Sequence, residues 1–259
     1  MKAFYSYQIL VFSSLTWFLL GFDARAAEYR LAADNKTLVD RNEAAFGSKL
    51  SAIKALLSSK EVTNQIRGLI SVGHLATDNK PRLQSEPQII VRLENLYRAT
   101  NNDVVLSALA ALVHIESPRS VPIFKAALAS TDKRQHLFGA HALLEMSSSG
   151  KENIETAVDK LVTIILDASG TEEADDVLVG SAFTILERLD TKAKLGFPNY
   201  VNSLPSQIKE QRLTPKEWNT RPDLIAIRKK YQESVRKWWT EKRPEIISRI
   251  LSANADGKN

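Results

Sequence analysis

Three segments of this chain repeat one pattern of small and large apolar residues, and this repetition constrains the fold more than any other feature. They are IRGLISVGHL at 66–75, LSALAALVHI at 106–115 and LFGAHALLEM at 137–146, with a weaker copy, SAFTILER, at 181–188. Small residues recur at Gly68, Ala108 and Gly139 and at Ser71, Ala111 and Ala142, and larger apolar residues recur at Val72, Leu112 and Leu143 and at Leu75, Ile115 and Met146. A helical hairpin of this size cannot bury its apolar face alone, so copies about 31–42 residues apart predict a stack of hairpins.

Each copy is followed by a turn and a second amphipathic helix. Ile154, Val158, Leu161 and Ile165, for example, recur at the spacing of one helix face. We expect these second helices at 85–99, 118–130, 152–168 and 193–209. Strand-like alternation is scarce, and only 10 glycines and 9 prolines in 259 residues make a loop-rich all-β chain unfavourable.

The two ends of the repeat region carry further helices. Residues 41–58 predict a helix that partly caps the N-terminal side, and 222–241 predict a strong helix with apolar residues every three or four positions. Pro244 allows a short last helix to about Leu251, and 252–259 are expected to be a disordered tail. The predicted divisions are therefore a repeat domain at 27–213, capping helices at 214–251 and the tail.

These repeats resemble the HEAT/armadillo-like family, in particular the short bacterial HEAT-repeat proteins. The resemblance covers about residues 60–190. The arginine that the family carries early in the first helix is present only as Arg67, and Ser107 and Phe138 stand at the equivalent places. The resemblance implies an all-α, right-handed α-solenoid of about four to five helical hairpins that ends in a C-terminal capping helix. An irregular helical bundle is the alternative architecture.

The first 26 residues predict a signal peptide. Met1-Lys2 is followed by a mostly apolar run at 9–20 and by Ala24-Arg25-Ala26, which fits a cleavage site after Ala26. The apolar run is shorter than the ~20 residues that a spanning helix needs. We therefore expect a periplasmic or secreted protein, and export disfavours nucleic acid as a partner. Because the chain has no cysteine, neither disulfides nor thiolate metal sites stabilise it.

Catalytic motifs are absent from the sequence. It contains no H-E-x-x-H, G-x-S-x-G, P-loop or G-x-G-x-x-G pattern, and thiol chemistry is excluded. This absence favours a protein that is not an enzyme and has no cofactor. A lyase-like HEAT protein is a less favoured alternative, because such lyases belong inside pigmented cells.

One set of potential metal ligands follows the repeat. His74 and His114 occupy the same place in successive copies, and Glu145 and Glu187 occupy it in the next two. Neighbouring His and Glu side chains can share a zinc ion, although helices ~8–10 Å apart do not allow all four to bind one ion. The alternative is an ordinary polar position near a helix end.

Charge is unevenly distributed, although the net charge is only +5. Residues 145–176 carry nine acidic and two basic side chains, and the run at Glu172, Glu173, Asp175 and Asp176 lies at an expected helix start, where acids are favoured. Residues 214–259 carry eleven basic and six acidic side chains. Arg228, Lys229, Lys230, Arg236, Lys237, Lys242 and Arg243 supply most of this basic charge.

The basic end has three interpretations: a solvated cap, a site for an acidic protein surface, or a contact with an anionic membrane or another polyanion. Trp238 continues the apolar stripe of its helix and is expected in the core. Trp239 lies about 100° away on the helix and is expected to be partly exposed, either closing the solenoid or contacting a partner.

These features together predict an exported, non-enzymatic protein-binding scaffold, because protein ligands are the usual use of a solenoid surface. A periplasmic inhibitor or immunity protein that neutralises a toxic enzyme is one concrete form, with the acidic stretch meeting a basic toxin. The candidate contact residues are Glu172, Glu173, Asp175, Asp176, Arg228, Lys229, Arg236, Lys237 and Trp239. Envelope attachment through the basic end is the alternative.

Overall fold

The computed structural model describes residues 35–146, 148–168, 173–199 and 220–256. All regular secondary structure in these residues is helical, which confirms the all-α class. The described residues divide into two compact units, 35–120 and 121–256. The predicted signal peptide at 1–26 and the predicted boundary at 213–214 lie outside the described residues.

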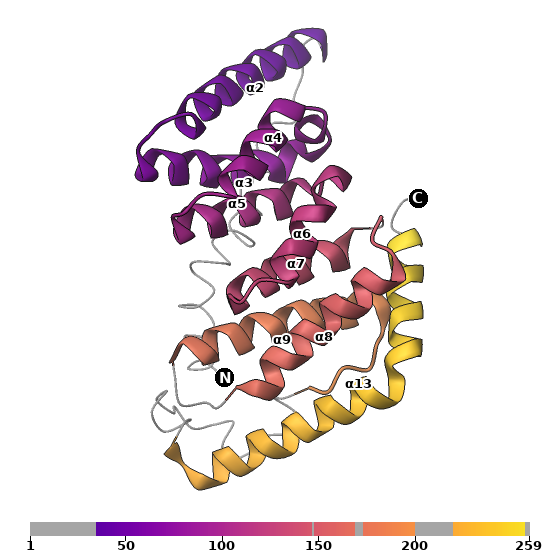
Figure 1. The fold of residues 1–259 in the computed structure, drawn as a ribbon. Coiled ribbons are helices and arrows are strands. Elements are labelled where there is room, and N and C mark those ends of the chain that lie inside the picture. The colour runs from indigo at the N-terminus through magenta and orange to yellow at the C-terminus, as the bar shows by residue number, and fades with distance from the viewer. Residues whose placement is uncertain (1–34, 147, 169–172, 200–219, 257–259) are drawn as a thin grey trace. The chain divides into compact units, whose positions relative to one another are not determined.

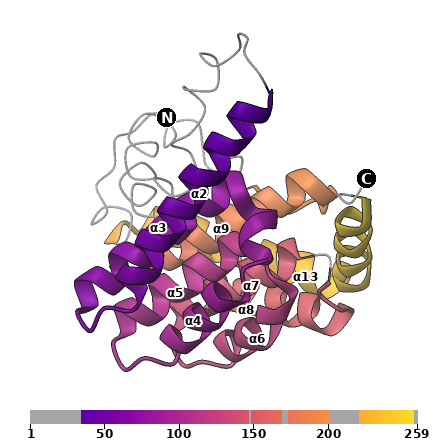
Figure 2. The same ribbon diagram turned by 90° about the horizontal axis from the view of Figure 1, so that it is seen from above.

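The first unit contains four α-helices. They are α2 (Asn35–Leu57), α3 (Val62–Gln84), α4 (Pro87–Leu96) and α5 (Asn102–Ile115), followed by a short 3-10 turn at Pro118–Ser120. α3 packs against the other three helices (Figures 1 and 2). α3 is kinked at Asn79, just before Pro81, because proline has no N–H to donate within a helix. Asn101 caps α5 by accepting hydrogen bonds from the backbone N–H groups of Asp103 and Val104.

The described residues of the second unit form five α-helices. They are α6 (Val121–Leu128), α7 (Lys133–Glu145), α8 (Lys151–Asp167), α9 (Glu173–Ala193) and α13 (Pro222–Asp256). α7 packs against α6, α8 and α9, and α13 packs against α8 and α9 (Figure 1). The core of α8 is formed by the predicted stripe, since Ile154, Val158, Leu161 and Ile165 are all fully or almost fully buried.

The repeated small residues permit close helix contacts. A Cβ added to Gly139 of α7 would lie 2.7 Å from the carbonyl oxygen of Phe124 in α6. A Cβ added to Gly68 of α3 would lie 3.0 Å from Leu57 at the end of α2. In both units, therefore, the glycine of a repeat segment faces the helix that precedes it in the chain. Ala108 holds the aligned position of α5 and is completely buried.

Three of the four predicted second helices are confirmed as α4, α6 and α8. The fourth is wrong at 194–199, where the chain is not helical. Lys194 and Gly196 there have φ angles of 53° and 66°, a left-handed conformation that ends a helix. The rest of that predicted helix, 200–209, lies outside the described residues.

The C-terminal helix differs from the prediction at its end. α13 runs continuously from Pro222 to Asp256 and contains Pro244. Figure 1 shows two straight arms joined by a bend, as a proline inside a helix can produce. The last helix expected after Pro244 is therefore part of α13 and not a separate element. The disordered tail predicted from Ser252 is instead helical as far as Asp256. Its Asn254 is buried, donates to the carbonyl of Leu144 (3.0 Å) and accepts from Lys192 (2.8 Å).

Candidate functional site

The acidic stretch and the basic C-terminal end contact each other inside the second unit. Arg243 of α13 pairs with Glu155 (3.0 Å) and Asp159 (2.5 Å) of α8. The Arg243 guanidinium also lies 4.6 Å from the centre of the Trp239 ring, which fits a cation–π contact. The opposite charges noted in the sequence are thus partly used to hold α13 on α8.

Glu145, a third member of the acidic stretch, also has partners within the chain. Its carboxylate lies 3.3 Å from Arg188 and 3.6 Å from Lys192, both on α9. Glu145, Glu155 and Asp159 are therefore compensated internally. The acidic stretch offers a partner less charge than its sequence indicates.

The acidic run of candidate contact residues is only partly placed. Glu173, Asp175 and Asp176 lie in the first turn of α9, as expected for acids at a helix start. Glu172 and the side chains of the other three residues lie outside the described part of the structure.

The two adjacent tryptophans are both buried. Trp238 is 5% exposed and donates a hydrogen bond to the carbonyl of Leu195 (3.1 Å), which confirms its core position. Its ring meets that of Phe197 edge to face, with 5.0 Å between centroids. The prediction that Trp239 is partly exposed is wrong. It is 4% exposed, because α8 covers it and Asp159 accepts its indole N–H at 2.5 Å.

The remaining basic candidates lie on the first arm of α13 and reach solvent. Lys229, Lys230, Arg236 and Lys237 are exposed, and Arg228 is half-buried. Lys237 lies 3.9 Å from Glu241, and both side chains are more than 60% exposed, so this pair contributes little. The structure thus separates the candidate residues: Trp239 belongs to the core, and the four exposed cations share a surface.

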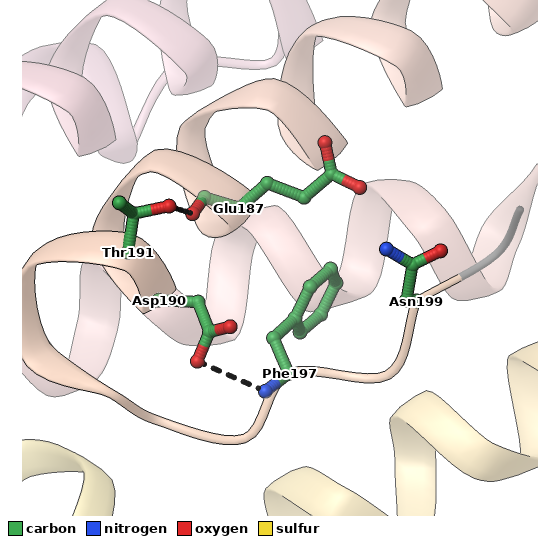
Figure 3. Close-up of a pocket in the computed structure, with 5 residues that line it drawn as sticks. All are labelled: Glu187, Asp190, Thr191, Phe197 and Asn199. Atoms are coloured by element: carbon green, nitrogen blue, oxygen red, sulfur yellow. Dashed lines mark hydrogen bonds between the residues drawn. The ribbon is translucent and has the colours of Figure 1, made fainter. Parts of the chain in front are cut away.

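A hollow of about 290 Å³ at the end of α9 was not predicted from the sequence. Glu187, Asp190, Thr191, Phe197 and Asn199 line it (Figure 3). Asp190 accepts a hydrogen bond from the backbone N–H of Phe197 (3.2 Å) and so helps to hold the chain reversal after α9. Burial and the nearby Asp190 carboxylate raise the pKa of Glu187. The lining offers two carboxylates and the Thr191 hydroxyl, which donates a hydrogen bond to the backbone carbonyl of Glu187 (3.0 Å).

A second hollow, of about 540 Å³, lies between α2 and the end of α3 in the first unit. The guanidinium of Arg82 lies 4.0 Å from the centre of the Phe46 ring and forms an ion pair with Glu43. Arg82 is 39 residues from Glu43 in the chain, so nothing in the local sequence pattern indicates this contact.

The His–Glu ladder has no metal-binding geometry in the described residues, where no three His, Asp or Glu side chains are grouped to hold an ion. His74 is exposed on α3 and His114 is half-buried on α5. Burial lowers the pKa of His114, and the positive charges of Lys80 and His74 lower it further. Glu145 is engaged by Arg188 and Lys192, which agrees with an ordinary polar position.

The lowered pKa of His114 predicts a loss of stability in mild acid. Below its ordinary pKa of 6.5, the unfolded chain binds a proton at His114 that the folded chain binds more weakly. The free energy of unfolding should therefore fall as the pH falls below about 6.5, until His114 is protonated in the folded chain as well. In His114→Gln this fall should be less steep, as measured by urea unfolding at several pH values. If the free energy of unfolding depended on pH equally in the variant and the original chain, His114 would not be the group responsible.

Comparison with protein-family models, curated proteins and solved structures found no match. Among the described helices, none combines the length and apolar character required to cross a membrane.

Proposed function

We propose that this chain is an exported, non-enzymatic scaffold that binds another protein through stacked HEAT-like hairpins in a right-handed solenoid. The observation that carries the proposal is that the same repeat positions are buried in α3, α5 and α7. Residues at the aligned positions Val72, Leu112 and Leu143 are completely buried. Helices that share this repeat also share a set of positions that reach the surface. The residue types at these positions can vary without disturbing the core.

Three such positions recur on each of these helices and are at least partly exposed. They are Arg67, Ile70 and His74 on α3; Ser107, Ala110 and His114 on α5; and Phe138, His141 and Glu145 on α7. We call this set the outer positions. In the first unit these positions are cationic, polar and apolar, and in the second they are aromatic, polar and anionic; either mixture suits the recognition of a folded protein.

Export is supported by the charge, apolar run and A-x-A sequence of residues 1–26. Within this class, a stoichiometric complex with a toxic enzyme would identify the chain as a periplasmic inhibitor or immunity protein. The acidic stretch supports this form less than its sequence suggested, since Glu145, Glu155 and Asp159 have partners within the chain.

The proposal predicts site-dependent crosslinking to a partner. A photoreactive amino acid is placed at Arg67 or Phe138, one outer position in each unit, and the chain is irradiated in its native envelope. Matched exposed controls on neighbouring helices are Gln88 of α4 and Lys125 of α6. We expect one protein, identified by mass spectrometry, to be captured in 1:1 stoichiometry from the outer positions and at least about tenfold less from the controls, because only interface residues are held against the partner.

Two results would contradict this prediction. Equal capture from Gln88 and Lys125 would exclude the outer positions as the interface. Absence of a 1:1 adduct at every position under several growth conditions would argue against a protein partner.

A further inference from the structure

Four cations gather on one face of the first arm of α13. Lys229 and Arg236 are seven residues apart, as are Lys230 and Lys237, so each pair lies almost in line along the helix. All four side chains are exposed. Leu224, Tyr231, Val235 and Trp238 are buried on the opposite face, where α13 packs against α8 and α9. We call the four cations the basic face.

The charge of this face is largely uncompensated. Lys229, Lys230 and Arg236 form no ion pair with the described residues, and Lys237 has only the long, exposed pair with Glu241. By contrast, Arg243 on the same helix is engaged by α8. Glu233 is the one acid between the two lines of cations, and it is exposed. The four positive charges span about 12 Å along the helix axis.

We propose that the basic face docks this protein on an anionic lipid bilayer. A bilayer presents a dense field of negative headgroups, to which each surface Lys or Arg adds attraction without a shaped pocket. An acidic protein surface would need anchors, usually aromatic, that fill desolvated pockets. The aromatic residues near the basic face, Tyr231, Trp238 and Trp239, are all buried inside the second unit. The structure therefore favours charge-driven adsorption.

The basic face has no large exposed apolar side chain, and this determines how it would contact a bilayer. Val62 of α3 is the one large apolar side chain that is strongly exposed among the described residues, and it is not on α13. The basic face thus has nothing to insert between lipid tails, and binding should weaken steeply with salt. The inference does not depend on a protein partner, and the predicted export would bring the face to a membrane surface.

The test is co-sedimentation of the full chain with vesicles of phosphatidylcholine alone or mixed with one-third phosphatidylglycerol. In the variant Lys229→Gln, Lys230→Gln, Arg236→Gln, Lys237→Gln, we expect the partition coefficient on the mixed vesicles to fall by about 100-fold or more at low salt. The matched control removes four exposed lysines that lie elsewhere, by Lys49→Gln, Lys60→Gln, Lys125→Gln and Lys151→Gln. This control should retain most of the binding although its net charge is the same.

A gain of binding provides a second readout that loss of folding cannot imitate. Glu233→Gln removes the one acid within the basic face and should raise the partition coefficient about fivefold. Equal binding to neutral and mixed vesicles would overturn the proposal, as would equal losses in the two four-site variants. Retention on immobilised poly-L-glutamate that depends on the basic face, without vesicle binding, would assign the face to an acidic protein and also overturn it.

Discussion

Replacing Trp239 by alanine should lower the free energy of unfolding by about 3–5 kcal/mol. The side chain is 4% exposed and lies under α8, so the substitution leaves a large cavity. It also removes the indole N–H that Asp159 accepts and the ring that lies beside the Arg243 guanidinium. Denaturant unfolding followed by circular dichroism measures the change. A partner-contacting, exposed tryptophan would instead affect binding and leave stability nearly unchanged.

Trp239→Phe separates packing from hydrogen bonding. Phenylalanine keeps most of the buried aromatic surface but has no donor for Asp159, so we expect a loss of about 1 kcal/mol. Lys229→Ala is the matched control on the exposed face of the same helix and should change stability by less than about 0.5 kcal/mol. If Trp239→Ala unfolded at the same denaturant concentration as Lys229→Ala, the buried position of Trp239 would be wrong.

Gly139→Ala should destabilise the chain by about 1–3 kcal/mol, although alanine is the better helix former. The new Cβ would lie 2.7 Å from the Phe124 carbonyl oxygen and 3.2 Å from the Ala127 Cβ, both on α6. Backbone cannot move aside as a flexible side chain can, so α7 and α6 must separate. Thermal and denaturant unfolding measure the effect, and a larger side chain such as leucine should increase it.

Gly180→Ala in α9 is the matched control for this prediction. No atom lies within 4 Å of the Cβ position at Gly180, so the substitution meets no neighbour. It should stabilise the chain by about 0.5–1 kcal/mol through helix propensity alone. Opposite signs for the two substitutions would demonstrate that the repeated glycine is required for close packing. A stabilising Gly139→Ala would contradict the contact with α6.

Helices were predictable where apolar spacing is regular. The stripe from Ile154 to Ile165 predicted α8 within one residue at each end, because the direction of a side chain repeats every 3.6 residues along a helix. Apolar spacing also predicted a helix at 193–209, and nothing in the sequence excluded it. The chain reverses there through the left-handed Lys194. A local hydrogen bond from the Phe197 N–H to Asp190 holds this turn, and the packing of Phe197 on Trp238 depends on α13.

The candidate contact residues were harder to predict than the helices. The exposed positions of Lys229, Lys230, Arg236 and Lys237 follow from the helical phase of α13, which the sequence shows. The burial of Trp239 does not, because its covering residue Asp159 is 80 positions away in the chain. The buried face of α13 is wide enough for two adjacent tryptophans. The spacing of apolar residues in the sequence does not distinguish such a wide face from a narrow one.

The sequence by itself determined the all-α class, the repeated small residues and the unequal distribution of charge, because these depend on neighbouring positions in the chain. Only the tertiary structure decided which charges meet. The packing of α13 on α8 turns Arg243 toward Glu155 and Asp159, and the packing of α7 and α9 joins Glu145 to Arg188 and Lys192. What reads as a separation of acidic and basic segments is, in space, partly a set of internal pairs, since Coulomb attraction depends on distance and not on sequence order.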